Sequence, residues 1–253
     1  MRYFLDIAYQ GTHYHGWQIQ ENAHSVQAEI QSKLSLILHQ ATDLVGSGRT
    51  DTGVHAEQQI AHFDTQSLMN PFDIVHRLNS ALPTDIAVKN IYPVAPDAHA
   101  RFDACKRSYE YRVSLRKNPF LREYSYHYRQ LPDVSTMNQA AELLLNYTDF
   151  QSFSKVKTEV KHFFCQIYQA KWSQEGDLLI FSISADRFLR GMVRAIVGTL
   201  LDVGLQKLNL DDFEKVIQSR DRKHAGWAVP PQGLFLTEVL YPFELKQADI
   251  HTY

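Results

Sequence analysis

The pattern of apolar and polar positions predicts strands and helices that alternate along the chain. Residues 3–9 carry apolar side chains at every second position, which is typical of a half-buried strand. Apolar residues at helical spacing predict an amphipathic helix over 25–39. Asn70 followed by Pro71 marks the start of a second helix, which we expect to continue through Leu78.

The same patterns extend to the end of the chain. We expect further strands at 58–63, 86–94, 108–115, 163–172, 178–184 and 234–240, and further helices at 136–145, 187–203 and 211–218. This order predicts an α+β fold with two similar α+β halves, 1–100 and 101–253, which meet near 95–101. We expect their strands to form one continuous, mainly antiparallel sheet with helices packed on one face. A cleft between the halves is the expected place of an active site.

The helix expected over 187–203 is apolar nearly all round, which predicts that it is buried. Arg187, Arg190 and Arg194 are spaced so that they fall on one narrow stripe of it. A buried guanidinium needs a carboxylate or a phosphate as its partner. A solvent-facing stripe explains the first two arginines, near the start of the helix, better than it explains Arg194. Asp51 is the candidate partner for Arg194.

Composition sets broad limits on what the chain does. Its 253 residues are 44% hydrophobic and 21% charged, as in a globular protein with a sizeable core. No apolar run reaches about eighteen residues, and Asp6 comes too early for a signal peptide, so we expect neither a membrane helix nor secretion. Two cysteines, Cys105 and Cys165, provide no disulfide framework and fit a reducing cytoplasm. His13 and His15 are a close pair without a Cys or an acid at ligand spacing, so we expect no metal site.

The segment 101–129 is basic although the chain as a whole has a formal net charge of −2. Eight bases and three acids give this segment a local net charge of +5. Seven aromatic residues are interleaved with the bases, namely Phe102, Tyr109, Tyr111, Phe120, Tyr124, Tyr126 and Tyr128. Cations for phosphates together with rings for bases are typical of a nucleic-acid surface. A solvated pair of strands with ordinary tyrosine packing explains the pattern equally well.

The most distinctive stretch is a glycine-rich loop around one acid and one base. Gly46, Gly48 and Gly53 fall within eight residues and enclose Arg49 and Asp51. Glycine at this density permits a tight turn or a close approach of the backbone to another group. A neighbouring cation favours the ionised form of a carboxylate, which is the form that a carboxylate nucleophile needs. The pattern therefore indicates a functional loop held between scaffold elements.

Two other interpretations of this loop compete. A surface turn with a solvated Asp and Arg fits the residue types as well, because loops are rich in Gly and Asp. A phosphate-binding P-loop is disfavoured by its register. The pattern G-x-x-x-x-G-K-[ST] would require Gly at the position of Asp43 and Lys at the position of Arg49.

Five segments together match the motifs of one known family. They are 9–18 (YQGTHYHGWQ), 48–56 (GRTDTGVHA), 101–111 (RFDACKRSYEY), 192–198 (MVRAIVG) and 230–236 (PPQGLFL). Through them nearly the whole chain resembles the bacterial tRNA pseudouridine synthase A (TruA) family. One departure is the segment 146–148 (NYT), where a glycine and often a histidine are expected. That segment is peripheral to the chemistry, so the departure concerns RNA docking rather than the reaction.

The resemblance implies a reaction and a set of site residues. The reaction is the isomerisation of uridine to pseudouridine in tRNA, at positions 38–40 of the anticodon stem-loop, without a cofactor or a metal. Asp51 of the first half is implied as the nucleophile, and the second half supplies Tyr109 and Arg194. Arg49 is expected to hold the RNA backbone, and Leu234 to line the cleft. The family also implies a cytoplasmic homodimer with the tRNA spanning both protomers.

Two functions of other classes remain as alternatives. A non-catalytic RNA-binding or RNA-folding protein would use the same basic, aromatic segment, but it would not depend on Asp51. A nucleotide hydrolase would need the P-loop that the register disfavours, and it should bind ATP with magnesium. Mapping pseudouridine in tRNA after incubation with the purified protein separates all three.

Overall fold

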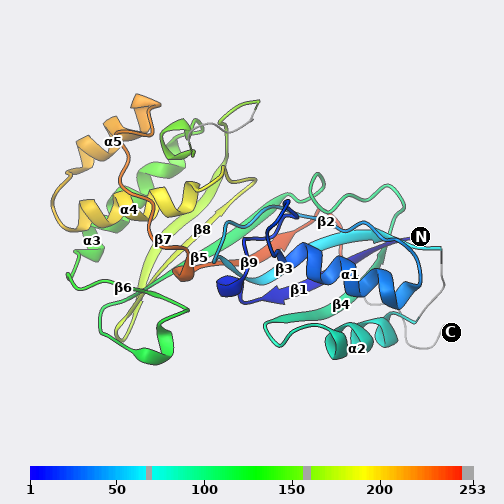
Figure 1. The fold of residues 1–253 in the computed structure, drawn as a ribbon. Coiled ribbons are helices and arrows are strands. Elements are labelled where there is room, and N and C mark those ends of the chain that lie inside the picture. The colour runs from blue at the N-terminus through cyan, green and yellow to red at the C-terminus, as the bar shows by residue number, and fades with distance from the viewer. Residues whose placement is uncertain (67–69, 156–160, 247–253) are drawn as a thin grey trace. The chain divides into compact units, whose positions relative to one another are not determined.

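The computed structural model describes residues 1–66, 70–155 and 161–246 (Figure 1). Within these residues the chain forms five α-helices and nine β-strands in an α+β arrangement. The sheet is mixed, because β5 and β6 pair in parallel whereas β1 pairs with both of its neighbours in an antiparallel manner. None of the helices in the described ranges is long and apolar enough to cross a membrane.

The chain divides into two compact units, and the division is not a simple cut. Met1–Cys105 and the segment that begins at Leu236 make up unit 1, and Lys106–Phe235 makes up unit 2. The sequence-based division at residue 100 instead assigns the whole C-terminal segment to the second half. The segment belongs to unit 1 because β9 (Leu234–Leu240) pairs with β3 (His55–Asp64), a contact across a large sequence separation that no local pattern indicates.

Unit 1 places two helices against a small sheet. Its strand order is β4–β1–β3–β9, and β2 pairs with β3. Its elements not yet given are β1 (Arg2–Tyr9), α1 (Val26–Leu38), β2 (Val45–Gly46), α2 (Pro71–Ala81) and β4 (Ile86–Val94). The helix starts read from the sequence are confirmed: the Ser25 side chain accepts from the Ala28 amide, and the Asn70 side chain accepts from the Phe72 amide.

The prediction that 3–9 is a half-buried strand was wrong, because β1 is buried on both faces. Phe4 and Asp6, on the face expected to meet solvent, are 0% and 5% exposed. Phe4 is covered by Tyr241 and Phe243, with ring centroids at 5.1 and 6.2 Å. Tyr241 and Phe243 lie near the other end of the sequence, so the alternation of residues within the strand could not predict this second buried face.

Unit 2 repeats the combination of a sheet with helices. Its strand order is β5–β8–β7, with β6 paired to β5. Its elements are β5 (Lys106–Ser114), β6 (Tyr126–His127), α3 (Val134–Leu143), β7 (Ile167–Glu175), β8 (Leu178–Ala185), α4 (Met192–Gly204) and α5 (Leu210–Ser219). Helix α3 packs on β7 and α4 packs on β5. Trp172 and Phe181, both almost fully buried, form the core of this layer.

The helix predicted over 187–203 begins later than expected. It starts at Met192, after Gly191, whose φ of 71° is incompatible with an α-helix. Arg187 and Arg190 therefore precede the helix, and the three arginines do not form one helical stripe. Only Arg194 lies on α4. The apolar pattern predicted one continuous helix because Phe188 and Leu189 lie shortly before Gly191, and Met192 and Val193 follow it.

Candidate active site

The loop that carries Asp51 connects β2 to β3, and both strands help to hold it. The Ser47 amide donates to the Ile60 carbonyl at 2.7 Å. The Gln59 side chain accepts from the Ser47 hydroxyl and donates to the Gly48 carbonyl, at 2.5 and 2.9 Å. Gln59 is 0% exposed, so a buried amide bridges the strand and the start of the loop. These bonds fix the first half of the loop.

The second half of the loop lies on residues 11–16, backbone against backbone. A Cβ added at Gly16 would lie 2.4 Å from the Thr50 carbonyl oxygen, and the φ of Gly16 is 88°. A Cβ added at Gly11 would lie 2.0 Å from the Val54 carbonyl oxygen. Both positions therefore require glycine, one for space alone and the other for space and for backbone conformation. The structure brings the motif at 9–18 directly beneath the motif at 48–56.

Hydrogen bonds join the same two segments. The Trp17 amide donates to the Thr50 carbonyl at 3.2 Å, and the Gly53 amide donates to the Tyr14 carbonyl at 3.3 Å. The hydroxyl groups of Tyr9 and Thr50 are 2.8 Å apart in a buried position. The main chains of Thr50 and Gly53, before and after the acid, are thus tied to Trp17 and Tyr14.

The two charged residues of the loop differ in exposure. Asp51 is half-buried, and its carbonyl accepts from the Val54 amide at 3.1 Å, which closes a tight turn. Arg49 is exposed, and its Nε donates to the Gln18 side chain at 3.2 Å. Thr50 and Val54 are 7% and 1% exposed. A turn with buried residues on both sides of its acid supports the functional-loop interpretation over that of a solvated surface turn.

Tyr109, predicted from the sequence as a site residue, lies on β5 in unit 2. It pairs with Ile183 of β8, and its ring meets the edge of Phe188 with centroids at 5.1 Å and planes at 86°. An edge-to-face contact of this kind restricts rotation of both rings. Phe188 was missed at the sequence level, where it was counted only as part of an apolar helix.

Arg194 holds the segment that precedes β9. Its Nε donates to the Val229 carbonyl at 2.6 Å, and its own carbonyl accepts from the Val229 amide at 3.2 Å. In the same segment the Pro230 carbonyl accepts from the Tyr111 hydroxyl at 2.8 Å. Burial raises the pKa of Tyr111 well above its usual range, and the nearby Arg194 guanidinium partly offsets that rise. Arg194 therefore acts on its surroundings as a cation and as a directed donor.

Leu234, the other predicted residue of unit 2, is the first residue of β9 and is 6% exposed. The residue before it is Gly233, where an added Cβ would lie 2.8 Å from the Arg112 carbonyl oxygen and 2.9 Å from the Tyr111 ring. The segment that ends at Leu234 is thus packed closely on β5. Tyr109, Arg194 and Leu234 all belong to unit 2, whereas Arg49 and Asp51 belong to unit 1. The pairing of Asp51 with Arg194 stays a prediction.

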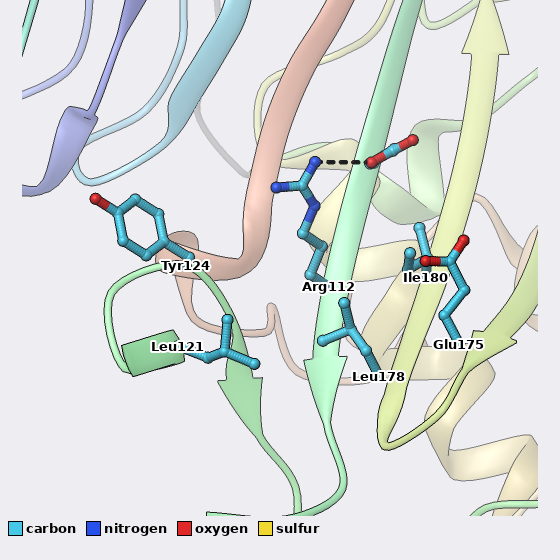
Figure 2. Close-up of a pocket in the computed structure, with 7 residues that line it drawn as sticks. Arg112, Leu121, Tyr124, Glu175, Leu178 and Ile180 are labelled. Atoms are coloured by element: carbon cyan, nitrogen blue, oxygen red, sulfur yellow. Dashed lines mark hydrogen bonds and ion pairs between the residues drawn. The ribbon is translucent and has the colours of Figure 1, made fainter. Parts of the chain in front are cut away.

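A hollow of about 320 Å³ lies on the face of the unit 2 sheet opposite to the one that carries Tyr109 (Figure 2). It is lined by Glu110, Arg112, Leu121, Tyr124, Glu175, Leu178 and Ile180. Glu110 and Arg112 alternate along β5 with Tyr109 and Tyr111, so their side chains point to the opposite face of the strand. The hollow is therefore a different surface from the one that carries Tyr109.

Some of the bases in the segment 101–129 form ion pairs with acids. Arg112 contacts Glu110 at 3.0 Å, as the dashed line in Figure 2 shows, and its guanidinium lies 3.9 Å from the centre of the Phe235 ring. Arg116 forms an exposed ion pair with Asp177 at 3.3 Å. Glu110 is already counted in the local net charge of +5, whereas Asp177 lies outside the segment, so the Arg116–Asp177 pair lowers the charge that the segment offers to a polyanion.

Comparison with known proteins agrees with the motifs. A family model described as tRNA pseudouridine synthase matches residues 7–103 and 140–242. The tRNA pseudouridine synthase A of Bacteroides fragilis is 49% identical over 248 residues, which cover 96% of this chain and 98% of that protein. The protein of the same name from Bacillus subtilis is 40% identical and covers 95% and 99%. Among solved structures, a CRISPR endoribonuclease Cse3 bound to 19 nt RNA aligns over 81% of this chain and 97% of its own, at 12% identity and a TM-score of 0.23, too weak to indicate a shared fold.

These matches identify the class of protein. The chain belongs to the tRNA pseudouridine synthases, which are isomerases. Within that class, its relatives over nearly the whole length place it in the tRNA pseudouridine synthase A (TruA) family. The resemblance read from the five sequence motifs is therefore confirmed.

Proposed function

We propose that this chain converts uridine to pseudouridine in tRNA with Asp51 as the nucleophile. The observation that carries the proposal is the support of the Asp51 loop. Two glycines, Gly11 and Gly16, bring a second backbone segment so close that no side chain fits between it and the loop. An acid held in one position, beside the exposed base Arg49, suits attack on a bound substrate better than a mobile surface acid does.

The reaction rearranges one bond. The bond between ribose C1′ and uracil N1 breaks, the base rotates, and C1′ joins C5. The proton that C5 loses is balanced by the one that N1 gains, so no oxidant, reductant or metal is required. A uridine inside a stacked stem must first leave the stack, which costs a few kcal/mol. Arg49, exposed beside the acid, is placed to hold the RNA backbone or to fill the gap that the flipped base leaves.

The residues of unit 2 take complementary roles in this proposal. Tyr109, whose ring is held edge-on by Phe188, stacks on the uracil and offers its hydroxyl for a proton transfer. Arg194 pairs with Asp51 and keeps it ionised, while its Nε–H to Val229 fixes the direction of the guanidinium. Leu234 lines the cleft of the proposed site.

The finer specificity also follows the family. We propose that the target uridines lie at positions 38–40 of the anticodon stem-loop, and that two protomers in a cytoplasmic homodimer bind one tRNA together. Pooling two basic segments favours this arrangement, because a single protomer carries a net charge of −2 and would grip a polyanion weakly.

The test replaces one oxygen of the acid. Asp51→Asn should leave tRNA binding and Tm unchanged and abolish pseudouridine formation, because an amide is not a nucleophile of this kind. Asp43→Asn is the matched control, since Asp43 is an exposed acid that precedes the same loop, and it should retain full activity. Pseudouridine is mapped in unmodified tRNA after incubation with each variant.

Each alternative makes a different prediction in this experiment. Product formation by Asp51→Asn would remove Asp51 from its role. If the wild-type chain binds tRNA without forming any product, it is an RNA-binding or RNA-folding protein instead. A mapped product at positions other than 38–40 would retain the reaction and revise the specificity.

A further inference from the structure

One of the three tryptophans in the chain is exposed, and the proposed chemistry does not use it. Trp17 and Trp172 are each 1% exposed and belong to the cores of their units. Trp227, in the segment between α5 and β9, is 45% exposed. A large ring left half in solvent is a common anchor for a binding partner.

The backbone on either side of Trp227 is fixed firmly. A Cβ added at Gly198 of α4 would lie 1.9 Å from the Trp227 carbonyl oxygen. The Gly226 amide donates to the Thr199 hydroxyl at 2.9 Å. A Cβ added at Gly226 would lie 2.9 Å from the backbone nitrogen of Thr199, in the same turn of α4, which is too close for a side chain. Two glycines therefore let this segment lie directly on the helix. The exposed ring is presented from a rigid support and not from a loose loop.

Two tyrosines extend the exposed ring into a continuous aromatic surface. The Tyr126 ring meets Trp227 edge-on, with centroids at 5.6 Å and planes at 78°, and it contacts Tyr128 at 5.5 Å. Both tyrosines are half-buried on and just after β6. We call Trp227, Tyr126 and Tyr128 the Trp227 platform. These tyrosines belong to the aromatic set whose role was left open between RNA contact and ordinary packing.

Several basic residues lie close to the platform along the chain. Lys223 and His224 are exposed shortly before Trp227, and Arg129 is exposed next to Tyr128. Lys207 acts electrostatically on Tyr128, together with its own partner Asp202. Rings with cations beside them are complementary to nucleotides, which offer a flat base and a phosphate.

The platform is also connected to the proposed site. Tyr126 and Arg194 both act electrostatically on the Tyr111 hydroxyl, so the three side chains lie near one another. Tyr111 donates to the Pro230 carbonyl, three residues after Trp227 in the same segment. A ligand on the platform would therefore lie close to the residues that surround Arg194.

We propose that the Trp227 platform stacks an unpaired base of the tRNA close to the target uridine. The inference rests on the proposed function and deepens it by naming a surface that recognises the substrate. Stacking of one base on an aromatic side chain contributes about a tenfold change in affinity. Since every base has a flat face, the platform favours an unstacked nucleotide over a regular stem without reading its sequence.

The single exposed tryptophan provides a direct probe. Binding of unmodified tRNA should quench the fluorescence of the wild-type protein, because a base stacked on Trp227 quenches it. Heparin, a polyanion without bases, should bind and leave the fluorescence nearly unchanged. Trp227→Phe removes the quenched signal, and Trp227→Ala should weaken tRNA binding about tenfold with an unchanged Tm. Phe72→Ala is the matched control, because Phe72 is 71% exposed and lies on α2 in unit 1, outside the platform and outside the segment 101–129.

Several outcomes would overturn the inference. Equal quenching by heparin and tRNA would mean that the ring senses charge and not a stacked base. Unchanged tRNA affinity in Trp227→Ala would show that the ring contributes nothing. A lower sedimentation coefficient of that variant would instead show that the platform joins two copies of the chain. Quenching by tRNA without any pseudouridine formation by the wild type would refute the proposed function and leave the platform standing.

Discussion

Two segments can be compared: the Asp51 loop in unit 1, and the segment around Val229 in unit 2 with the Arg194 side chain that binds it, which we call the Arg194 segment. Both are well supported, but by different contacts. The loop rests on Gly11 and Gly16, where the main chain of one segment touches that of another. The segment around Val229 also touches backbone, at Gly198 and Gly226, but two side-chain donors hold it as well, Arg194 Nε and the Tyr111 hydroxyl. A support made of backbone leaves no room for any side chain. A support made of side-chain donors can be weakened in steps.

The difference suggests a division of tasks between the two regions. A nucleophile must be placed within a fraction of an ångström, which close backbone contact achieves. A cation that keeps the nucleophile ionised tolerates more variation, because Coulomb energy changes slowly with distance. We therefore expect substitutions beneath the Asp51 loop to abolish activity and substitutions at the Arg194 segment to reduce it in degrees.

The largest effect is expected from Gly16→Ala. The new Cβ would lie 2.4 Å from the Thr50 carbonyl oxygen, and the φ of 88° adds backbone strain. The loop must move, so we expect pseudouridine formation to be lost and unfolding to become easier by about 2–4 kcal/mol. Chemical denaturation and single-turnover kinetics measure the two effects.

Gly176→Ala is the control that separates backbone strain from the steric clash of an added Cβ. Gly176 has a φ of 60°, but nothing lies within 4 Å of its added Cβ. Strain alone should cost about 1 kcal/mol, and activity should stay at the wild-type level. If Gly16→Ala behaves like Gly176→Ala, the close contact beneath the loop does not position Asp51, and the contrast between the two regions fails.

A smaller effect is expected from Arg194→Lys, which keeps the charge and removes the planar donor set. An ammonium cannot donate to the Val229 carbonyl with the geometry of Nε and hold a carboxylate at the same time. Turnover should fall roughly 10- to 100-fold, equal to about 1.4–2.8 kcal/mol, while Tm changes by only a few degrees. Single-turnover rates with saturating enzyme isolate the chemical step.

The exposed Arg190 is the control for this substitution. Arg190→Lys should leave the rate unchanged, because the residue precedes α4, and the substitution keeps both its positive charge and the carbonyl that accepts from the Lys155 amide. A full rate in Arg194→Lys would show that charge alone suffices at this position. Complete loss of activity in Arg194→Lys would show that the Arg194 segment tolerates substitution no better than the Asp51 loop does, which contradicts the proposed contrast.

Local sequence patterns predicted most helices and strands, but few of the tertiary contacts that these elements make. The capped helix α1 and the strand β9 were placed within a residue or two, because their signals lie inside the segment. The second buried face of β1 and the assignment of the C-terminal segment to unit 1 depend on partners far away in the sequence. The start of α4 was missed because a single glycine conformation decides it.

The candidate site shows the same limit. Asp51 and Arg49 stood out through a dense glycine pattern within one loop. The glycines at 11 and 16 were visible in the sequence, but nothing there indicated that they lie under Thr50 and Val54. Trp227 was missed altogether, since an isolated tryptophan in a loop carries no sign of exposure. Contacts within a motif could be predicted, whereas contacts between motifs could not.

The mildest change is a reversible one, a shift in pH, which acts on a residue of unit 1 outside the proposed site. His62 lies on β3, is 5% exposed, and accepts from the Ala100 amide through Nδ1 at 3.2 Å. Burial, assisted by Arg2 and His99, lowers its pKa to about 4. Two acids act in the opposite direction, Asp64 and Asp103.

The folded protein thus holds His62 neutral at a pH where the unfolded chain, with a pKa near 6.5, binds a proton. Stability from this group is complete above about pH 6.5 and is lost as pH falls toward 4, by about 2 kcal/mol at pH 5. His62→Asn offers an oxygen near the position of Nδ1 and should remove that part of the pH dependence. Urea denaturation of both proteins between pH 7.5 and 5 measures the difference. Equal slopes would show that His62 takes up its proton without loosening β3.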